Sequence, residues 1–186
     1  MTIMEAEYKD NKLNGQMIRY DDEGEIISRE TYSGGMLQGE AHYYQYRNGQ
    51  KLKADCTYKN SLLHGPRTAY YEDGTLKSEE NYRHGKLNGT RSSYYNNGKL
   101  EIRENYLDGK LSGERTVYFP SGELWYKENY KAGRLEGERV GYFTSGVKRL
   151  EEFYVDGMLE GKRKIYSETG EILTNEDYHW GALTHN

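Results

Sequence analysis

The sequence is poor in the residues that build a thick core or cross-link a chain. Only 34% of its residues are hydrophobic, against a usual share of about 45–50%, so we do not expect a thick two-layer core. The single cysteine, Cys56, excludes an intramolecular disulfide, and nothing indicates an oxidising compartment. The two prolines, Pro66 and Pro120, mark no linker-like segment. These shortages favour one thin domain over residues 1–186.

The sequence also lacks long apolar runs and an excess of positive charge. No stretch is long enough to span a bilayer, and the N-terminal segment has no apolar run of signal-peptide length. If the chain is complete, we expect a cytoplasmic protein. The net charge of −4 argues against nucleic acid as the main ligand. It weakly favours a basic partner.

Tyrosine and glycine, by contrast, are abundant and regularly placed. The chain has 20 Tyr and 22 Gly. The pattern Y-x-x-G-x-L-x-G at Tyr82–Gly89 recurs along the chain, and its tyrosines advance by 24, 26 and then 24 residues five times. A fixed period of this length is typical of stacked-repeat proteins. We expect seven repeats, followed by a half-repeat at 178–186; they end near Gly15, Gly39, Gly65, Gly89, Gly113, Gly137 and Gly161.

Turn signals alternate along each repeat. Asn97-Gly98 is an example of one junction, and Asp108-Gly109 is an example of the other. Asn-Gly and Asp-Gly favour two-residue hairpin turns, in which both central residues need a positive φ. With strands of roughly 7–10 residues between the turns, the sequence predicts an all-β protein: an elongated, single-sheet antiparallel meander of about seven 24-residue β-hairpin repeats.

The predicted turns also fix which residues pair across each hairpin. A turn at Asn97-Gly98 places Arg91 opposite Glu104. The same rule gives four more pairs: Arg67–Glu80, Arg115–Glu128, Arg139–Glu152 and Arg163–Glu176. In the longer second repeat, a turn at Asn48-Gly49 pairs Ala41 with Cys56, so both charges are absent together. The first repeat pairs Met17 with Glu30 and breaks the pattern.

Alternation along a strand sorts these residues onto two faces. We expect one face to carry the Arg–Glu pairs together with Leu and Tyr, and we take it as the inner face. The other face carries about one tyrosine per repeat, among them Tyr94 and Tyr118, and is otherwise largely polar.

These repeats resemble MORN repeats. Tyr94–Leu100 and Glu104–Gly113 resemble more closely the bacterial variant found in YwqK-type toxin–antitoxin proteins. The resemblance covers nearly the whole chain. It implies an elongated antiparallel sheet of hairpins. In the bacterial branch it implies an antitoxin or immunity protein that binds a toxin domain, often a nuclease or a deaminase. It marks no site residue.

Three groups of residues are candidates for partner binding, and each has a plainer interpretation. Arg91, Arg115, Glu104 and Glu128 form part of a charged stripe that could meet a partner, or they are cross-strand pairs that only stabilise the sheet. Tyr71, Tyr95, Phe119 and Phe143 lie next to the turns and are either binding anchors or packing between repeats. Asp21 and Asp22 belong to an acidic turn that is either solvated or a mimic of phosphates.

No pattern points to an enzyme. The five histidines have no metal-ligand spacing, and the lone cysteine adds nothing. The glycines lie in turns rather than before a helix, so they do not form a nucleotide loop. We therefore expect no catalytic residues, no cofactor and no metal.

Three functional hypotheses follow. The leading one is a non-enzymatic scaffold that binds and blocks a cognate toxin. The alternative is a membrane- or cytoskeleton-associated scaffold, although the charge of −4 and the absence of a Lys/Arg cluster argue against anionic lipid. The third is a set of repeats that docks a catalytic domain. The sequence leaves open a homodimer through the sheet edges.

Overall fold

A computed structural model describes residues 3–47 and 50–184. The predicted turn at Asn48-Gly49 and the last two residues of the predicted half-repeat lie outside these ranges. The chain divides into two compact units, Met1–Asn88 and Gly89–Asn186, and we describe each by itself. That the repeats form a single domain stays a prediction.

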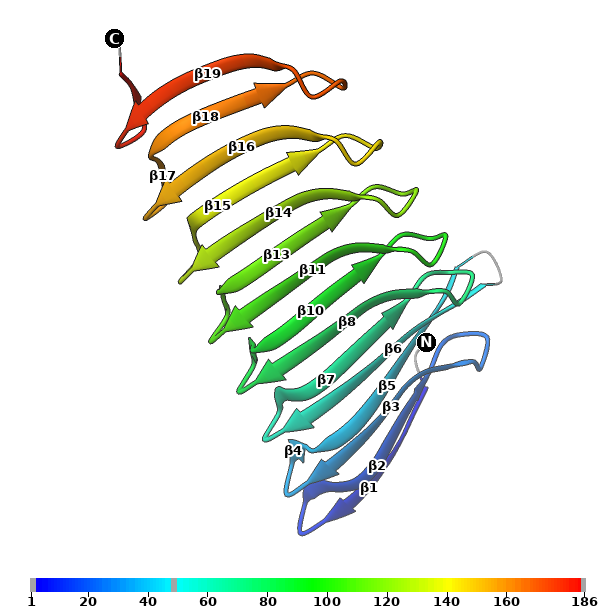
Figure 1. The fold of residues 1–186 in the computed structure, drawn as a ribbon. Coiled ribbons are helices and arrows are strands. Elements are labelled where there is room, and N and C mark those ends of the chain that lie inside the picture. The colour runs from blue at the N-terminus through cyan, green and yellow to red at the C-terminus, as the bar shows by residue number, and fades with distance from the viewer. Residues whose placement is uncertain (1–2, 48–49, 185–186) are drawn as a thin grey trace. The chain divides into compact units, whose positions relative to one another are not determined.

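The first unit is an antiparallel succession of hairpins (Figure 1). Its strands are β1 (Ile3–Lys9), β2 (Lys12–Tyr20), β3 (Ile26–Ser33), β4 (Met36–Leu37), β5 (Gly39–Arg47), β6 (Gln50–Lys59), β7 (Leu62–Tyr70), β8 (Leu76–Arg83) and β9 (Lys86–Leu87). Short strands such as β9 begin the second arm of a hairpin. One irregular residue, here Asn88, separates such a strand from the glycine that ends the repeat.

The second unit repeats the same plan. Its strands are β10 (Gly89–Tyr94), β11 (Leu100–Leu107), β12 (Lys110–Leu111), β13 (Gly113–Tyr118), β14 (Leu124–Lys131), β15 (Arg134–Tyr142), β16 (Lys148–Val155), β17 (Met158–Leu159), β18 (Gly161–Tyr166), β19 (Ile172–His179) and β20 (Ala182–Leu183). The predicted fold class, an all-β antiparallel meander of hairpins with a repeat of about 24 residues, is confirmed. The described residues form no helix, and therefore none long and apolar enough to cross a membrane.

The two junctions of each repeat use different turns. At Asp108-Gly109 both residues have a positive φ, 49° and 82°, and Leu107 pairs directly with Lys110. This is a two-residue type I′ turn. At Asn97-Gly98 only Gly98 has a positive φ, 79°. A two-residue turn was predicted there, and that prediction is wrong.

The loop at Asn97-Gly98 runs from Tyr95 to Lys99. Gly98 N–H donates to Tyr95 O at 2.9 Å, and Tyr95 N–H donates to Lys99 O at 2.8 Å. The side chain of Asn97 accepts from Lys99 N–H at 3.0 Å, which favours an ordinary turn followed by a glycine in the left-handed region. A bulge between Ser93 and Tyr94 adjusts the register, so the pairing further along the strands is as predicted.

Beyond the bulges next to the turns, the predicted register is confirmed. Arg91 pairs with Glu104, and the other four expected Arg–Glu pairs also face each other; these are Arg67–Glu80, Arg115–Glu128, Arg139–Glu152 and Arg163–Glu176. Met17 pairs with Glu30, and Ala41 pairs with Cys56. Register therefore follows from the repeat pattern even where the charges are missing.

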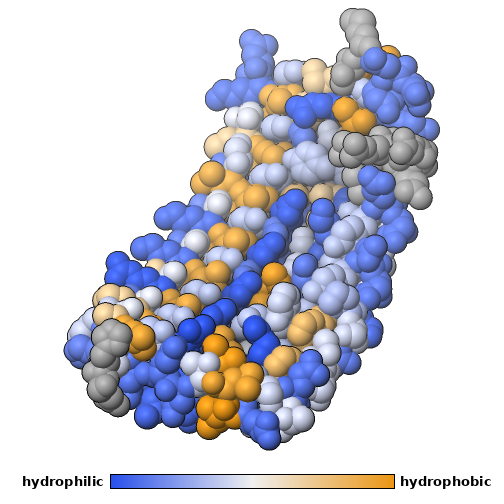
Figure 2. Space-filling model, turned by 90° about the horizontal axis from the view of Figure 1, so that it is seen from above, coloured by the Kyte–Doolittle hydropathy of each residue, from blue (hydrophilic) through white to orange (hydrophobic). Residues whose placement is uncertain are grey.

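The face that carries the Arg–Glu pairs is the more buried one, as expected of an inner face. Glu104 is 5% exposed and Glu128 is 4% exposed, whereas few hydrophobic side chains are fully buried. The space-filling view shows hydrophobic and hydrophilic residues alternating at short intervals over the visible face (Figure 2). The interior of this fold is thin and largely polar.

One place on this face shows how residue sizes compensate between neighbouring strands. Tyr126 on β14 pairs with Gly141 on β15, and a Cβ atom on Gly141 would lie 2.9 Å from Tyr126 Cε1. The equivalent pairs of the second unit are Ile102–Val117 and Leu150–Ile165. A large aromatic ring is therefore matched by the loss of the facing side chain.

We predict that Gly141→Ala lowers the free energy of unfolding by about 1–3 kcal/mol, because the added methyl overpacks the Tyr126 ring. The double variant Gly141→Val/Tyr126→Ile recreates the Ile102–Val117 pair and should recover most of the loss. Urea titration of the two variants measures this. A Gly141→Ala protein as stable as the wild type would show that the ring has room to move.

Candidate functional site

An uninterrupted ladder of buried charge runs through the second unit. We call the chain of ion pairs Arg91–Glu104–Arg115–Glu128–Arg139–Glu152–Arg163–Glu176 the Arg–Glu ladder. Arg115 Nη1 lies 2.7 Å from Glu128 Oε2 within its own hairpin. Arg115 Nε lies 2.8 Å from Glu104 Oε1 of the preceding hairpin. The sequence predicted the first kind of pair and missed the second.

Each ladder carboxylate also accepts a hydrogen bond from a tyrosine two residues further along the same strand, and for Glu104, Glu128 and Glu152 this tyrosine is the third donor residue. Tyr106 OH donates to Glu104 at 3.0 Å, and Tyr130 OH donates to Glu128 at 3.2 Å. Residues i and i+2 lie on one face of a strand, so the repeat tyrosine always reaches the repeat glutamate. The buried carboxylates are thus satisfied from several sides, which such groups require.

The first unit contains contacts of this kind within two of its hairpins. Arg67 Nη1 lies 2.7 Å from Glu80 Oε2, and Tyr82 OH donates to the same oxygen at 2.9 Å. At Glu30, where Met17 replaces the arginine, Arg19 supplies a guanidinium instead, with its Nη1 at 3.3 Å. Arg19 was missed by the sequence analysis. The available signal was its position two residues after Met17, and therefore on the same face.

Burial and hydrogen bonding have opposite effects on the pKa values of Glu104 and Glu128. Burial alone would raise the pKa of Glu104, but hydrogen bonds from Arg115, Arg91 and Tyr106 outweigh it, so this pKa lies below its usual value. The pKa of Glu128 is lowered in the same way, against burial, by Arg115 and Arg139. Burial and the nearby carboxylate raise the pKa of Tyr106. Glu104 and Glu128 therefore stay ionised, and Tyr106 stays protonated, at neutral pH.

The candidate aromatic residues of the second unit occupy one structural position, the first residue of each five-residue loop. Tyr95 N–H donates to Lys99 O, and Phe119 N–H and Phe143 N–H make the equivalent bonds. All three side chains are half-buried. Tyr95 OH donates to Tyr118 O of the next hairpin at 2.7 Å, so this ring also packs between repeats.

Trp125, which the sequence analysis did not single out, extends this group. Its ring stacks on Phe119 with centroids 5.0 Å apart and planes 21° apart, and the residue is 38% exposed. We call Tyr95, Phe119, Trp125 and Phe143 the aromatic loop cluster. The bulge between Val117 and Tyr118 makes the face of Trp125 hard to assign by alternation.

The first unit holds the remaining candidates in the same kind of loop. Tyr71 occupies the first loop position there and lies under the Lys77 ammonium, 5.4 Å from the ring centroid. Asp21 takes this position in the first repeat, and its carboxylate accepts from Glu23 N–H at 3.0 Å and from Glu25 N–H at 2.9 Å. Asp22 is exposed in that loop. Asp21 therefore closes a turn, as Asx side chains commonly do.

The described residues offer no arrangement for metal or nucleophilic chemistry. No group of three or more His, Cys, Asp or Glu that could hold a metal occurs among them. His42 Nδ1 lies 2.6 Å from Asp55 Oδ1, but Cys56 points to the opposite face of β6, so these residues form no nucleophile–base pair.

Comparison with protein families agrees with this description. Residues 63–84, 87–108 and 111–132 match the model of the MORN repeat variant. Three consecutive repeats of the chain are MORN repeats. MORN repeats indicate a repeat scaffold with a binding role, and this all-β scaffold is typically non-catalytic. No curated protein sequence matches the chain.

We predict that Glu128→Gln lowers the free energy of unfolding by about 3 kcal/mol, near the lower end for breaking a buried ion pair, because Arg115 and Arg139 keep some solvent contact. The matched control is Asp156→Asn, which removes an exposed partner of Arg134 at 2.7 Å and should change little. Urea denaturation compares the two. Equal effects would mean that the ladder stabilises no more than a surface pair.

We also predict a definite pH dependence of stability. Glu104 and Glu128 have folded pKa values below the usual 4.5, so their stabilisation is fully present above pH 4.5 and is lost as the pH falls through the folded values. Chemical denaturation between pH 7 and pH 2 should show a loss confined to the acid side. Glu128→Gln should reduce that slope. Stability that falls already between pH 7 and pH 5 would contradict this assignment.

Proposed function

We propose that this protein is a non-enzymatic scaffold that binds and blocks a bacterial toxin domain. Three features support the proposal: the match to the MORN repeat variant, the absence of catalytic or metal-binding arrangements among the described residues, and the likeness of the repeats to the bacterial toxin–antitoxin type. A toxin that acts on nucleic acid carries a basic cleft, and the charge of −4 suits such a partner.

The observation that carries the proposal is the aromatic loop cluster. Phe119 and Trp125 stack on each other, and Trp125 stays 38% exposed. Interface hot spots are enriched in Trp and Tyr held by a rigid surround, and aromatic rings supply large contact area at little entropic cost. The loops that hold these rings are closed by backbone hydrogen bonds, such as Phe119 N–H to Glu123 O at 2.8 Å.

The Arg–Glu ladder has a different role in this proposal. The carboxylates of Glu104, Glu128 and Glu152 are buried and already accept hydrogen bonds from Arg and Tyr. Contact with a partner would require breaking satisfied buried pairs, which costs several kcal/mol each. The ladder therefore holds the sheet rigid, and the loops beside it bind the partner.

The test is co-expression with the protein encoded by the neighbouring gene. We expect that protein to arrest growth, this chain to restore growth, and the two to co-purify. Trp125→Ala should weaken the complex about tenfold or more, as hot-spot truncations do. Trp180→Ala is the matched control, because Trp180 is 53% exposed and lies in a type I′ turn outside the cluster.

A harmless neighbour, or no complex with it, would refute the toxin-blocking role. Equal weakening by Trp125→Ala and Trp180→Ala would refute the assignment of the aromatic loop cluster. Pelleting with anionic vesicles, lost at high salt, would instead favour the membrane-associated scaffold.

A further inference from the structure

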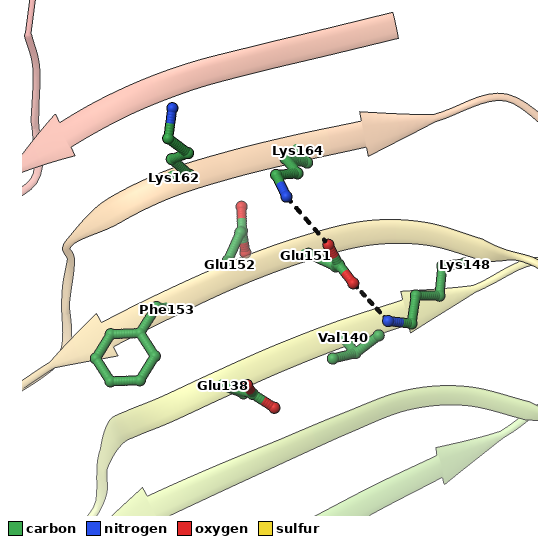
Figure 3. A pocket seen from close by; sticks show the side chains of 8 residues that line it. All are labelled: Glu138, Val140, Lys148, Glu151, Glu152, Phe153, Lys162 and Lys164. Carbon is green, nitrogen blue, oxygen red and sulfur yellow. Dashed lines mark hydrogen bonds and ion pairs between the residues drawn. The ribbon is translucent and has the colours of Figure 1, made fainter. Parts of the chain in front are cut away.

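The opposite face of the second unit carries a groove of about 240 Å³. It lies over β15, β16 and β18, and its eight lining residues include Glu138, Val140, Glu151, Phe153, Lys162 and Lys164, together with the ladder residue Glu152 (Figure 3). Glu138 pairs with Phe153, and Val140 pairs with Glu151, so these side chains point away from the Arg–Glu ladder. None of the residues that line the groove belongs to the aromatic loop cluster.

The groove departs from the polar pattern of the repeats. Phe153 stands where other repeats have Asn81, Asn105 and Asn129, and it is 45% exposed. Asn105 shows the usual role of this position, because its side chain donates to Glu114 O at 3.0 Å. Phe153 makes no such bond and exposes an aromatic ring. Val140 likewise stands where Ser92 and Thr116 occur. An exposed aromatic ring beside a half-buried valine, on a face that is otherwise largely polar, favours a binding site.

The charges around Phe153 are unevenly compensated. Glu151 accepts from Lys148 Nζ and from Tyr166 OH, each at 2.5 Å, so Lys164 Nζ reaches the same carboxylate only at 4.0 Å. Lys162 Nζ lies 3.6 Å from Asp177, and both side chains remain about half exposed. Two ammonium groups with weak partners thus flank one side of Phe153. Glu138, which is exposed, flanks the other side.

We propose that this groove binds an extended peptide segment that places an apolar side chain on Phe153 and Val140 and an acidic side chain at Lys162 and Lys164. The incoming carboxylate complements the two ammonium groups, and the apolar side chain covers the exposed ring. Glu138 repels an acidic group on its side and so fixes the direction of the segment. This second contact site goes beyond the proposed toxin contact through the loops.

The test uses a displayed library of random linear peptides selected on the full chain. We expect enrichment of peptides with a large apolar residue next to Asp or Glu. Phe153→Asn should weaken their binding by about tenfold or more, and so should Lys162→Thr/Lys164→Thr. These substitutions take residues that equivalent positions of other repeats already hold, namely Asn129, Thr90 and Thr116, so the sheet should fold. Circular dichroism verifies this.

Lys127→Thr is the matched control, because Lys127 lies on the same face but pairs with Glu114 outside the groove. Peptides that bind the Phe153→Asn variant equally well, or no enrichment on the wild type over that variant, would overturn the proposal. Enrichment of peptides that carry a basic residue, and whose binding depends on Glu138, would also overturn the proposal. The Phe153→Asn variant should still restore growth in the co-expression test, because the groove is a second contact site. Loss of peptide binding with intact growth rescue therefore tests the groove independently of toxin blocking.

Discussion

The structure depends on keeping buried carboxylates satisfied inside a thin sheet. A single layer of strands has little apolar material to bury, and here the buried face is built from Glu, Arg and Tyr. Burying an ion pair is favourable only when every remaining lone pair and N–H finds a partner. Glu128 meets this condition through Arg115, Arg139 and Tyr130. Because Arg115, Arg139 and Arg163 each join two hairpins, the same contacts that satisfy the charges also join one repeat of the second unit to the next.

This constraint explains which positions vary and which do not. Where Met17 replaces an arginine, Arg19 moves in to serve Glu30. Where Ala41 replaces the arginine, Cys56 replaces the glutamate, so no buried charge is left alone. Side-chain size is compensated too, because Gly141 leaves room for the large ring of Tyr126. Substitutions on the ladder face are thus compensated within the sheet. Phe153, by contrast, stays 45% exposed in the described structure, and this exposure favours a contact role.

Much of the fold follows from the sequence because the repeat supplies the same information several times. The spacing of Tyr and Gly gives the hairpins, and the Arg–Glu pairs give the register. The turn type at Asn97-Gly98 was not predictable from the dipeptide, since the Asn97 side chain accepts from Lys99 N–H and so favours the five-residue loop. The bonds from Arg115 to Glu104 were missed because hairpin pairing says nothing of contacts between hairpins. Trp125 and Phe153 were missed because exposure depends on bulges and on neighbouring strands.

The most direct test of this account is the ionisation of a single ladder carboxylate. An NMR titration of the Glu128 side-chain carboxyl carbon in the folded protein measures its pKa. The account predicts a value below the usual 4.5, because the donors from Arg115, Arg139 and Tyr130 outweigh burial. A value at or above 4.5 would contradict it, because the effect of burial would then outweigh the hydrogen bonds, and the ionised carboxylate would destabilise the folded state.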